Sequence, residues 1–463
     1  MAALTARSAL WAPLAWLPGG GWQHDVLLRI GADGCWSEIR AGVAAPAGAT
    51  RLAGPALPGM VDAHSHAFQR AFAGLAERRS GAHDDFWSWR DRMYGVALRI
   101  TPEQLHAIAA QLYAELLQGG YTQVCEFHYL HHAPDGRPYA DALALSRALA
   151  QAAHDAGIGL TLLPVLYERA GFAADALRDD QRRFAAGVDR VIALRDGVRA
   201  LRLAHVDAGT AIHSLRAATP ASIRQLVDAL AGDDAPIHIH VAEQTAEVDD
   251  CIAATGLHPI EWLAREVGLD PRWQLVHATH VVPDEIDTVA RAGAGVVLCP
   301  STEANLGDGT TDLPAWLERR ALTSIGSDSQ VGRCWPQELR LLEYGQRLAL
   351  RRRNVGAAPE LGIDSTATRL FNRVLAGGAI AAGFDSWGLI AGARADLLVV
   401  DPKLPGLRGV PATHLLDALV FATDSPSFSD VWVGGRQVLA QGCANQVDAI
   451  GSRFEKVMRQ LWA

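Results

Sequence analysis

The chain has 463 residues, of which 49% are hydrophobic and 20% are charged. This balance is typical of a globular protein that buries a sizeable core, and it excludes a disordered, collagen-like or coiled-coil chain. Because 51 acidic residues outnumber 42 Lys and Arg residues, the net charge is −9. No basic run dominates the sequence, so we expect no nucleic-acid partner.

The cysteines and the hydropathy indicate a compartment. The six cysteines form no CxxC pair, and reduced thiols are the default for a chain of this kind. No run of about 18 apolar residues occurs, so we expect no membrane partner. The apolar start at 8–17 is expected to form a first strand rather than a signal peptide. We therefore predict a cytoplasmic protein.

Both ends of the chain carry the patterns of short strands. Residues 25–30 lead into a glycine-containing turn, and residues 431–439 are typical of a hairpin around a Gly-Gly pair. Residues 395–401 form a further expected strand. We predict that segments 1–56 and 385–463 combine into one small β-sandwich domain.

Between the two ends, short apolar runs alternate with longer helical patterns such as 102–118 and 220–230. Strands that alternate with helices favour parallel β-α units, and eight of them favour a TIM-like (β/α)8 barrel, here over residues 57–384. A doubly wound open sheet is the alternative, but no GxGxxG motif follows the first strand. The eight expected strands are 59–64, 122–127, 159–165, 201–205, 236–241, 274–277, 295–299 and 322–326.

Polar residues stand where several of these strands end, and in such a barrel catalytic groups gather at the carboxyl ends of strands. His64 and His66 close the first expected strand, where side chains two residues apart point to the same side. His240 closes the fifth, His277 the sixth and Asp328 the eighth. Three imidazoles and one carboxylate suit Zn²⁺ or Fe²⁺, with an open position for water.

Two more residues near the fifth strand bear on this site. Glu243 follows His240 by three residues and supplies a carboxylate one turn on. His238 lies deeper in the strand and is either a further ligand or a core histidine. A bound divalent ion lowers the pKa of water from ~16 to about 7, which makes hydroxide available at neutral pH.

This set of residues resembles the single-metal deaminases of the amidohydrolase superfamily, which are metal hydrolases on a (β/α)8 barrel. Those enzymes use an HxH pair, a His with a Glu three residues on, another His and a final Asp. Two-metal members usually carry a carboxylated lysine after the fourth strand. The only lysines here are Lys403 and Lys456, near the end of the chain. The resemblance therefore implies one metal per chain.

Several loop motifs are similar to those of the formimidoylglutamate deiminase family within that superfamily. The similarity extends through most of the barrel and is weaker in the terminal β segments. One residue departs from the expected pattern, because Gln330 stands where the family is expected to have a histidine. The similar motifs are HSHAFQR at 64–70, FWSWR at 86–90, EFHY at 126–129, HSLR at 213–216, AEQ at 242–244, HATH at 277–280 and STEANLGDG at 301–309.

The resemblance implies a reaction, namely hydrolytic deimination of N-formimino-L-glutamate to N-formyl-L-glutamate and ammonia in histidine degradation. Metal-bound hydroxide would attack the formimino carbon, His277 would orient the attack, and Asp328 would take the proton of the water. Glu243 would carry protons to the departing nitrogen. The implied ligands of Zn²⁺, or of Fe²⁺, are His64, His66, His240 and Asp328.

The implied substrate is a small molecule with two carboxylates, and arginine matches a carboxylate with two parallel hydrogen bonds. The aromatic cluster Phe86, Trp87 and Trp89 is expected to be core packing, and the roles of Glu303 and Asn305 are left open. The substrate contacts of the family fall on Gln69, Arg90, Tyr129, His213 and Arg216.

Two other functions stay open at this point. A deaminase of a cyclic amidine, such as a purine or pyrimidine base, would use the same metal site but would favour aromatic stacking over arginines. A catalytically silent amidohydrolase-like binding protein would be expected to lose metal ligands. The resemblance also suggests a homodimer, and it leaves open whether N-formimino-L-aspartate is a further substrate.

Overall fold

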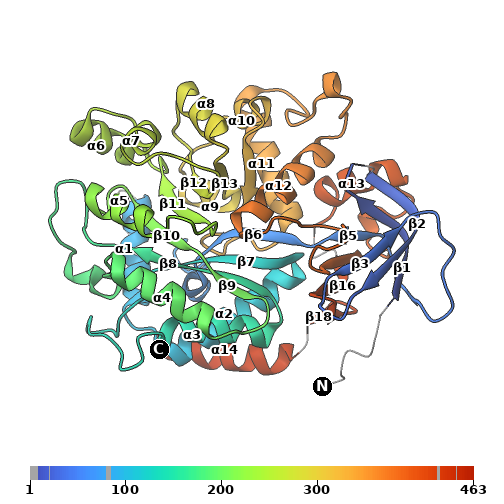
Figure 1. Cartoon of the computed structure of the whole chain (residues 1–463), viewed down its shortest axis with the longest axis horizontal. Coiled ribbons are helices and arrows are strands. Elements are labelled where there is room, and N and C mark those ends of the chain that lie inside the picture. Colours follow the sequence, from blue (N-terminus) through green and yellow to red (C-terminus); the bar gives the residue numbers. More distant parts are fainter. Residues whose placement is uncertain (1–8, 20, 80–84, 425–427, 445) are drawn as a thin grey trace.

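The computed structural model describes residues 9–19, 21–79, 85–424, 428–444 and 446–463. Eight parallel strands follow one another around a barrel in the order β6-β7-β8-β10-β11-β12-β13-β14, and the short β9 pairs with β8 (Figure 1). The predicted (β/α)8 barrel is therefore confirmed. The strands are β6 (Met60–Ser65), β7 (Tyr121–His128), β8 (Gly159–Leu166), β9 (Val206–Ala208), β10 (Thr210–Ser214), β11 (Ile237–Val241), β12 (Trp273–His277), β13 (Gly295–Leu298) and β14 (Leu322–Ile325).

The expected fourth strand at 201–205 is wrong, whereas each of the other expected barrel strands overlaps an observed one. Arg202 and His205 have φ values of 50° and 61°, so the backbone turns through the left-handed region and cannot extend there. The chain enters the sheet only at β9 and β10. Leu201 and Leu203 gave a strand-like pattern because both side chains pack, partly buried, against the core.

Helices cover the outside of the barrel, and α2 shows how the sequence specifies them. Thr101 and Gln104 form a reciprocal capping box and Pro102 occupies the first turn, three features that favour a helix start. The barrel helices are α1 (Phe86–Ala97), α2 (Pro102–Gln118), α3 (Ala144–Ala156), α4 (Val188–Ala200), α5 (Pro220–Ala229), α6 (Thr245–Thr255), α7 (Pro259–Glu266), α8 (Pro283–Ala292), α9 (Pro300–Leu306), α10 (Leu313–Glu318), α11 (Trp335–Leu350) and α12 (Thr366–Ala381).

The two chain ends form a second sheet, in the order β18-β17-β16-β15-β5-β1-β2-β3, with β4 beside β1. The expected hairpins are confirmed as the antiparallel pairs β2–β3 and β16–β17. Residues of β1, β2, β15 and β16 share one hydrophobic cluster, so this sheet encloses a core of its own. Its strands are β1 (Ala9–Leu17), β2 (Gly21–Ile30), β3 (Trp36–Arg40), β4 (Thr50–Arg51), β5 (Ala56–Pro58), β15 (Leu397–Val400), β16 (Phe428–Val433), β17 (Arg436–Ala440) and β18 (Cys443–Ala444).

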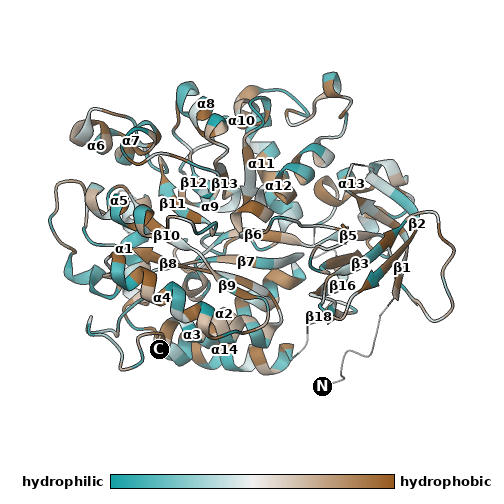
Figure 2. Cartoon of the chain, viewed as in Figure 1, coloured by the Kyte–Doolittle hydropathy of each residue, from teal (hydrophilic) through white to brown (hydrophobic). Residues whose placement is uncertain are grey.

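Hydropathy follows this architecture. Figure 2 shows hydrophobic residues concentrated on the strands of the end sheet and mixed colours along the outer helices. Two helices follow β15, namely α13 (Leu415–Phe421) and α14 (Val447–Leu461), and α14 lies against α2 of the barrel. No helix among the described residues is long and apolar enough to cross a bilayer. The exact division into domains at 56/57 and 384/385 stays a prediction.

The contact between α12 and β14 depends on a glycine. A Cβ atom at Gly377 would lie 2.2 Å from the backbone oxygen of Thr323, so the helix and strand would have to separate. We expect Gly377→Ala to destabilise the protein by about 1–3 kcal/mol through overpacking. The measurement is the urea midpoint of unfolding, followed by circular dichroism.

Gly451 in α14 provides the matched control, because an added Cβ there would meet its nearest neighbouring side-chain atom at 3.9 Å. Gly451→Ala should leave the midpoint unchanged or raise it, since alanine is the better helix former by roughly 0.5–1 kcal/mol. Equal midpoints for the two variants would contradict the close contact of α12 with β14.

Candidate active site

The predicted site residues meet at the carboxyl ends of the barrel strands, where active sites of this fold are built. His64 lies in β6, His240 in β11 and His277 at the end of β12, whereas His66 and Asp328 lie just beyond β6 and β14. All five side chains are buried. Strand order therefore assembles in space the residues that are far apart in the sequence.

Three imidazoles turn the same ring nitrogen toward one point. The Nε2 atom of His64 lies 3.2 Å from that of His66 and 3.0 Å from that of His240. The Nδ1 atoms of His66 and His240 lie 3.0 and 2.8 Å from the carbonyl oxygens of Phe127 and His213, which can only accept a hydrogen bond. The Nε2 atoms of His66 and His240 therefore each carry a lone pair of electrons. These lone pairs form a site for a cation.

Electrostatics and spacing both suit a metal ion. Burial lowers the pKa of His64 to about 3 and also lowers the pKa values of His66 and His240, so the rings are neutral ligands. Oδ1 of Asp328 lies 3.5 and 3.4 Å from the Nε2 atoms of His64 and His66. Ligand atoms around a tetrahedral Zn²⁺ at about 2.0–2.2 Å would be roughly 3.3–3.6 Å apart. The site is a metal-binding site.

Next to these ligands, His277 lies among three carboxylates. Its Nε2 atom is 3.7 Å from both Oε1 of Glu243 and Oδ2 of Asp328, and its Nδ1 atom is 3.4 Å from Oε1 of Glu303. Burial opposes a charge on this ring, but the carboxylates outweigh burial and raise the pKa of His277 to about 10. Burial raises the pKa of Glu243 to about 7, against the opposing effect of His277. Glu243 can therefore accept and donate a proton near neutral pH.

Glu303 and Asn305, whose roles the sequence left open, differ in burial. Glu303 is buried beside His277, and its Oε1 atom also accepts a hydrogen bond of 2.9 Å from the backbone nitrogen of Cys299. Glu303 therefore orients His277. Asn305 is exposed and donates to Glu77 at 2.9 Å, so its side chain serves the surface of the loop.

His238, which was either a ligand or a core histidine, is a core histidine. It is fully buried, and its Nε2 atom lies 2.8 Å from the carbonyl oxygen of Ala381 on α12. His238 and His240 point to the same side of β11, as residues two apart on a strand do. His238 lies deeper along the strand, and its contact with Ala381 keeps it out of the cluster of metal ligands.

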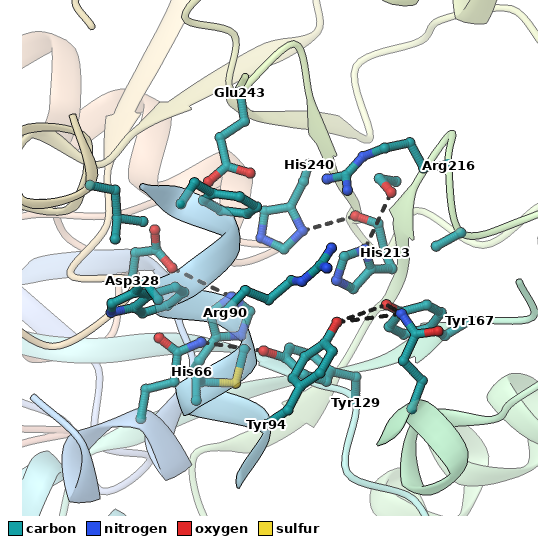
Figure 3. Close-up of a pocket in the computed structure, with 18 of the residues that line it drawn as sticks. His66, Arg90, Tyr94, Tyr129, Tyr167, His213, Arg216, His240, Glu243 and Asp328 are labelled. Atoms are coloured by element: carbon teal, nitrogen blue, oxygen red, sulfur yellow. Dashed lines mark hydrogen bonds and ion pairs between the residues drawn. The ribbon is translucent and has the colours of Figure 1, made fainter. Parts of the chain in front are cut away.

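A pocket opens above this centre, and Figure 3 shows its polar lining. Three ligands (His66, His240 and Asp328) and the residues Glu243 and His277 line it, whereas His64 is fully buried and is not among the lining residues. The five expected substrate contacts all line the same pocket, namely Gln69, Arg90, Tyr129, His213 and Arg216.

The two arginines bring unpaired donors into this pocket. Among the described residues, Arg216 forms an ion pair with Glu247 at 4.0 Å and Arg90 forms one with Asp91 at 3.6 Å. Both guanidinium groups lie over the ring of Trp87, at 5.6 and 4.5 Å from its centre. The Nε atoms of both are buried and have no hydrogen-bond partner in the described part of the chain. An anionic ligand would satisfy them.

Two phenols and an amide in the pocket wall were not predicted from the sequence. The hydroxyl of Tyr167 lies 3.3 Å from that of Tyr94 and accepts a hydrogen bond of 2.9 Å from Gln181. Tyr94 lies one helical turn after Arg90 on α1, and Tyr167 directly follows β8, so both positions were available as signals. Gln181 lies in a short 3₁₀ helix, Asp179–Phe184, and carried no signal in the sequence.

The aromatic cluster at the start of α1 differs from its expected role as core packing. Phe86 and Trp89 line the pocket and are only half-buried, while Trp87 supports the two arginines. The helix periodicity places residues 86, 89 and 90 on one side of α1, which faces the pocket.

Comparisons with known proteins agree with this geometry. A model of the amidohydrolase family matches residues 56–438. The chain is 46% identical to formimidoylglutamate deiminase of Pseudomonas aeruginosa, over 98% of this chain and 99% of that protein.

Solved structures agree as well. The crystal structure of an amidohydrolase from Brucella melitensis aligns with a TM-score of 0.93 and 43% identity, over 98% of this chain and 100% of the other. A zinc-bound adenosine deaminase from Xanthomonas campestris, with a TM-score of 0.81 and 22% identity over 98% of both chains, shares the fold. With its barrel, its buried cluster of histidines and these similarities, the chain belongs to the amidohydrolase family.

Proposed function

We propose that this protein hydrolyses N-formimino-L-glutamate to N-formyl-L-glutamate and ammonia, as a step of histidine degradation. The C=N bond of the formimino group is replaced by C=O from water, and its nitrogen leaves as ammonia. The observation that carries the proposal is one pocket that is lined both by metal ligands and by two arginines with spare donors. The identity of 46% to a formimidoylglutamate deiminase supports the same substrate.

The metal of the proposal is one Zn²⁺ per chain, with Fe²⁺ as the alternative, held by His64, His66, His240 and Asp328. When bound, such an ion supplies Lewis acidity and makes a water molecule acidic enough to ionise near pH 7. Imidazole nitrogens and one carboxylate are the donor set that either ion accepts.

The protons are handled by three side chains around the reacting carbon. Oδ1 of Asp328 faces the histidine ligands, whereas Oδ2 faces His277, so Asp328 can take a proton from water on a separate oxygen. His277, held by its carboxylates, carries positive charge toward the attacked carbon. Glu243, with a pKa of about 7, passes a proton to the departing nitrogen.

The two carboxylates of the substrate are bound by Arg90 and Arg216. The amide nitrogen of Gln69 donates to the hydroxyl of Tyr129 at 3.3 Å. The amide oxygen of Gln69 has no partner among the described residues, so the side chain can still form a hydrogen bond with a ligand. His213 borders the same space. These five residues therefore provide donors that match a diacid better than a neutral base.

A deaminase of a cyclic amidine is the second candidate. Phe86 and Trp89 line the pocket with aromatic surface, on which a purine or pyrimidine could stack. Against it stand the two arginines, whose charge a nucleobase would leave unpaired. A silent binding protein is disfavoured because each ligand and Glu243 are present and clustered. A cytoplasmic location and a homodimer stay predictions.

The substrate is tested by ammonia release from N-formimino-L-glutamate, beside guanine, adenine, cytosine and N-formimino-L-aspartate. We expect rapid release from formimino-glutamate and a loss of about 10²–10⁴-fold in kcat for Glu243→Gln, because the proton carrier is removed. Elemental analysis should find the metal content of this variant unchanged. Turnover of a nucleobase and not of formimino-glutamate would refute the substrate.

The arginines are tested by Arg90→Met and Arg216→Met. Leaving a carboxylate unpaired in a buried site costs ~2–5 kcal/mol, so kcat/KM for formimino-glutamate should fall by about 30-fold or more in each variant. Arg224→Met is the control, since Arg224 forms a surface ion pair with Glu266 in which both side chains are 46% exposed. Wild-type kcat/KM in both pocket variants would contradict the proposed contacts.

A further inference from the structure

The barrel closes at a seam between β6 and the loop after β14. No ladder joins these two strands in the described structure, and Ser65 and Asp328 form only an isolated bridge. Backbone hydrogen bonds cross here, from Asp328 to the carbonyl of His64 at 2.9 Å and from His66 to the carbonyl of Asp328 at 3.2 Å. Three of the metal-site side chains therefore belong to residues of the seam, so their spacing depends on how firmly the seam is held.

The side chain of Gln330 ties the two sides of this seam together. Its Nε2 atom donates to the carbonyl oxygen of Asp328 at 2.7 Å and to Oγ of Ser65 at 3.0 Å. Because the carbonyl of Asp328 can only accept, the nitrogen of the amide must face it. The hydroxyl of Ser65 in turn donates to Glu126 on β7 at 2.8 Å. One amide therefore links the loop after β14, through Ser65 of β6, to β7.

The backbone of the loop after β14 is strained, so hydrogen bonds are needed to hold its conformation. Asp328 and Gln330 have φ values of 49° and 69°, so two non-glycine residues adopt the left-handed region within three positions. The side chain of Gln330 is fully buried, so water cannot replace the hydrogen bonds that it makes. The guanidinium of Arg333 donates to the backbone oxygen of Gln330 and fixes the other end of the residue.

We propose that Gln330 is a positioning residue that fixes the carboxylate of Asp328 relative to His64 and His66, and so controls how long the metal is retained and with what geometry. The inference rests on the proposed metal centre and not on the proposed substrate. Metal release can be followed without substrate, so the two can fail separately.

The test compares Gln330→Met, which has similar size and no donor, with Gln330→His, whose ring N–H can still donate. Zinc-loaded protein is mixed with a chromophoric chelator, and cobalt-loaded protein is examined by visible absorption. Loss of a contact that orients a ligand typically costs 10–100-fold in metal affinity, so we expect Gln330→Met to release zinc about 10–100-fold faster and to show shifted cobalt bands. Gln330→His should restore most of both.

The control is Gln346→Met on α11, which removes another buried amide that donates to a backbone carbonyl, that of Thr311, at 2.9 Å. It should release zinc at the wild-type rate. If Gln330→Met does not fold, Gln330→Asn decides, because its amide is one methylene too short to reach both acceptors. Wild-type release and spectra in the folded variant, or equally fast release from the control, would overturn the proposal.

Discussion

The top of the barrel is organised by a buried cluster of imidazole nitrogens that lies beside the carboxylate of Asp328. The Nδ1 atoms of His66 and His240 are held by backbone carbonyls, and this leaves their Nε2 lone pairs facing His64 across 3.0–3.2 Å. Such a concentration of lone pairs is unfavourable without a positive charge between them. Burial also keeps the rings from becoming protonated, so a metal ion is the cation that suits them.

The same constraint explains the arrangement around the cluster. His277 lies next to the metal ligands but is surrounded by Glu243, Asp328 and Glu303, which raise its pKa, while burial lowers the pKa values of the neighbouring imidazoles. The pKa values of histidines a few ångströms apart therefore move in opposite directions, because three carboxylates surround His277, whereas burial outweighs the one carboxylate beside His64 and His66. Further out, Arg90 and Arg216 bring charge of the sign that a diacid requires.

Much of this could be predicted from the sequence, because a barrel strand ends where its apolar run ends. That rule located His64, His66, His240, His277 and Asp328 at one face. It failed at 201–205, where Leu201 and Leu203 are apolar because they pack against the core from a turn. A single sequence does not show left-handed backbone at Arg202 or His205, and the strand was therefore placed too early.

The contacts that connecting segments make were harder to predict. Gln181 reaches the pocket from a short 3₁₀ helix in the connection between β8 and α4. The role of Glu303 depends on the position of His277, which lies 26 residues away. Gln330 could be recognised as unusual only by comparison, and its role follows from the seam that it crosses. The roles of such side chains depend on residues that are near in space and distant in sequence, so the local periodicity of the sequence does not predict them.

A metal titration of activity decides whether one metal ion in this cluster is required for hydrolysis of a diacid amidine. Protein stripped by a chelator is given increasing Zn²⁺, and ammonia release from N-formimino-L-glutamate is measured at each addition. We expect no activity in the stripped protein and a linear rise that ends at one equivalent per chain. Activity without metal, or a rise that continues to two equivalents, would contradict it.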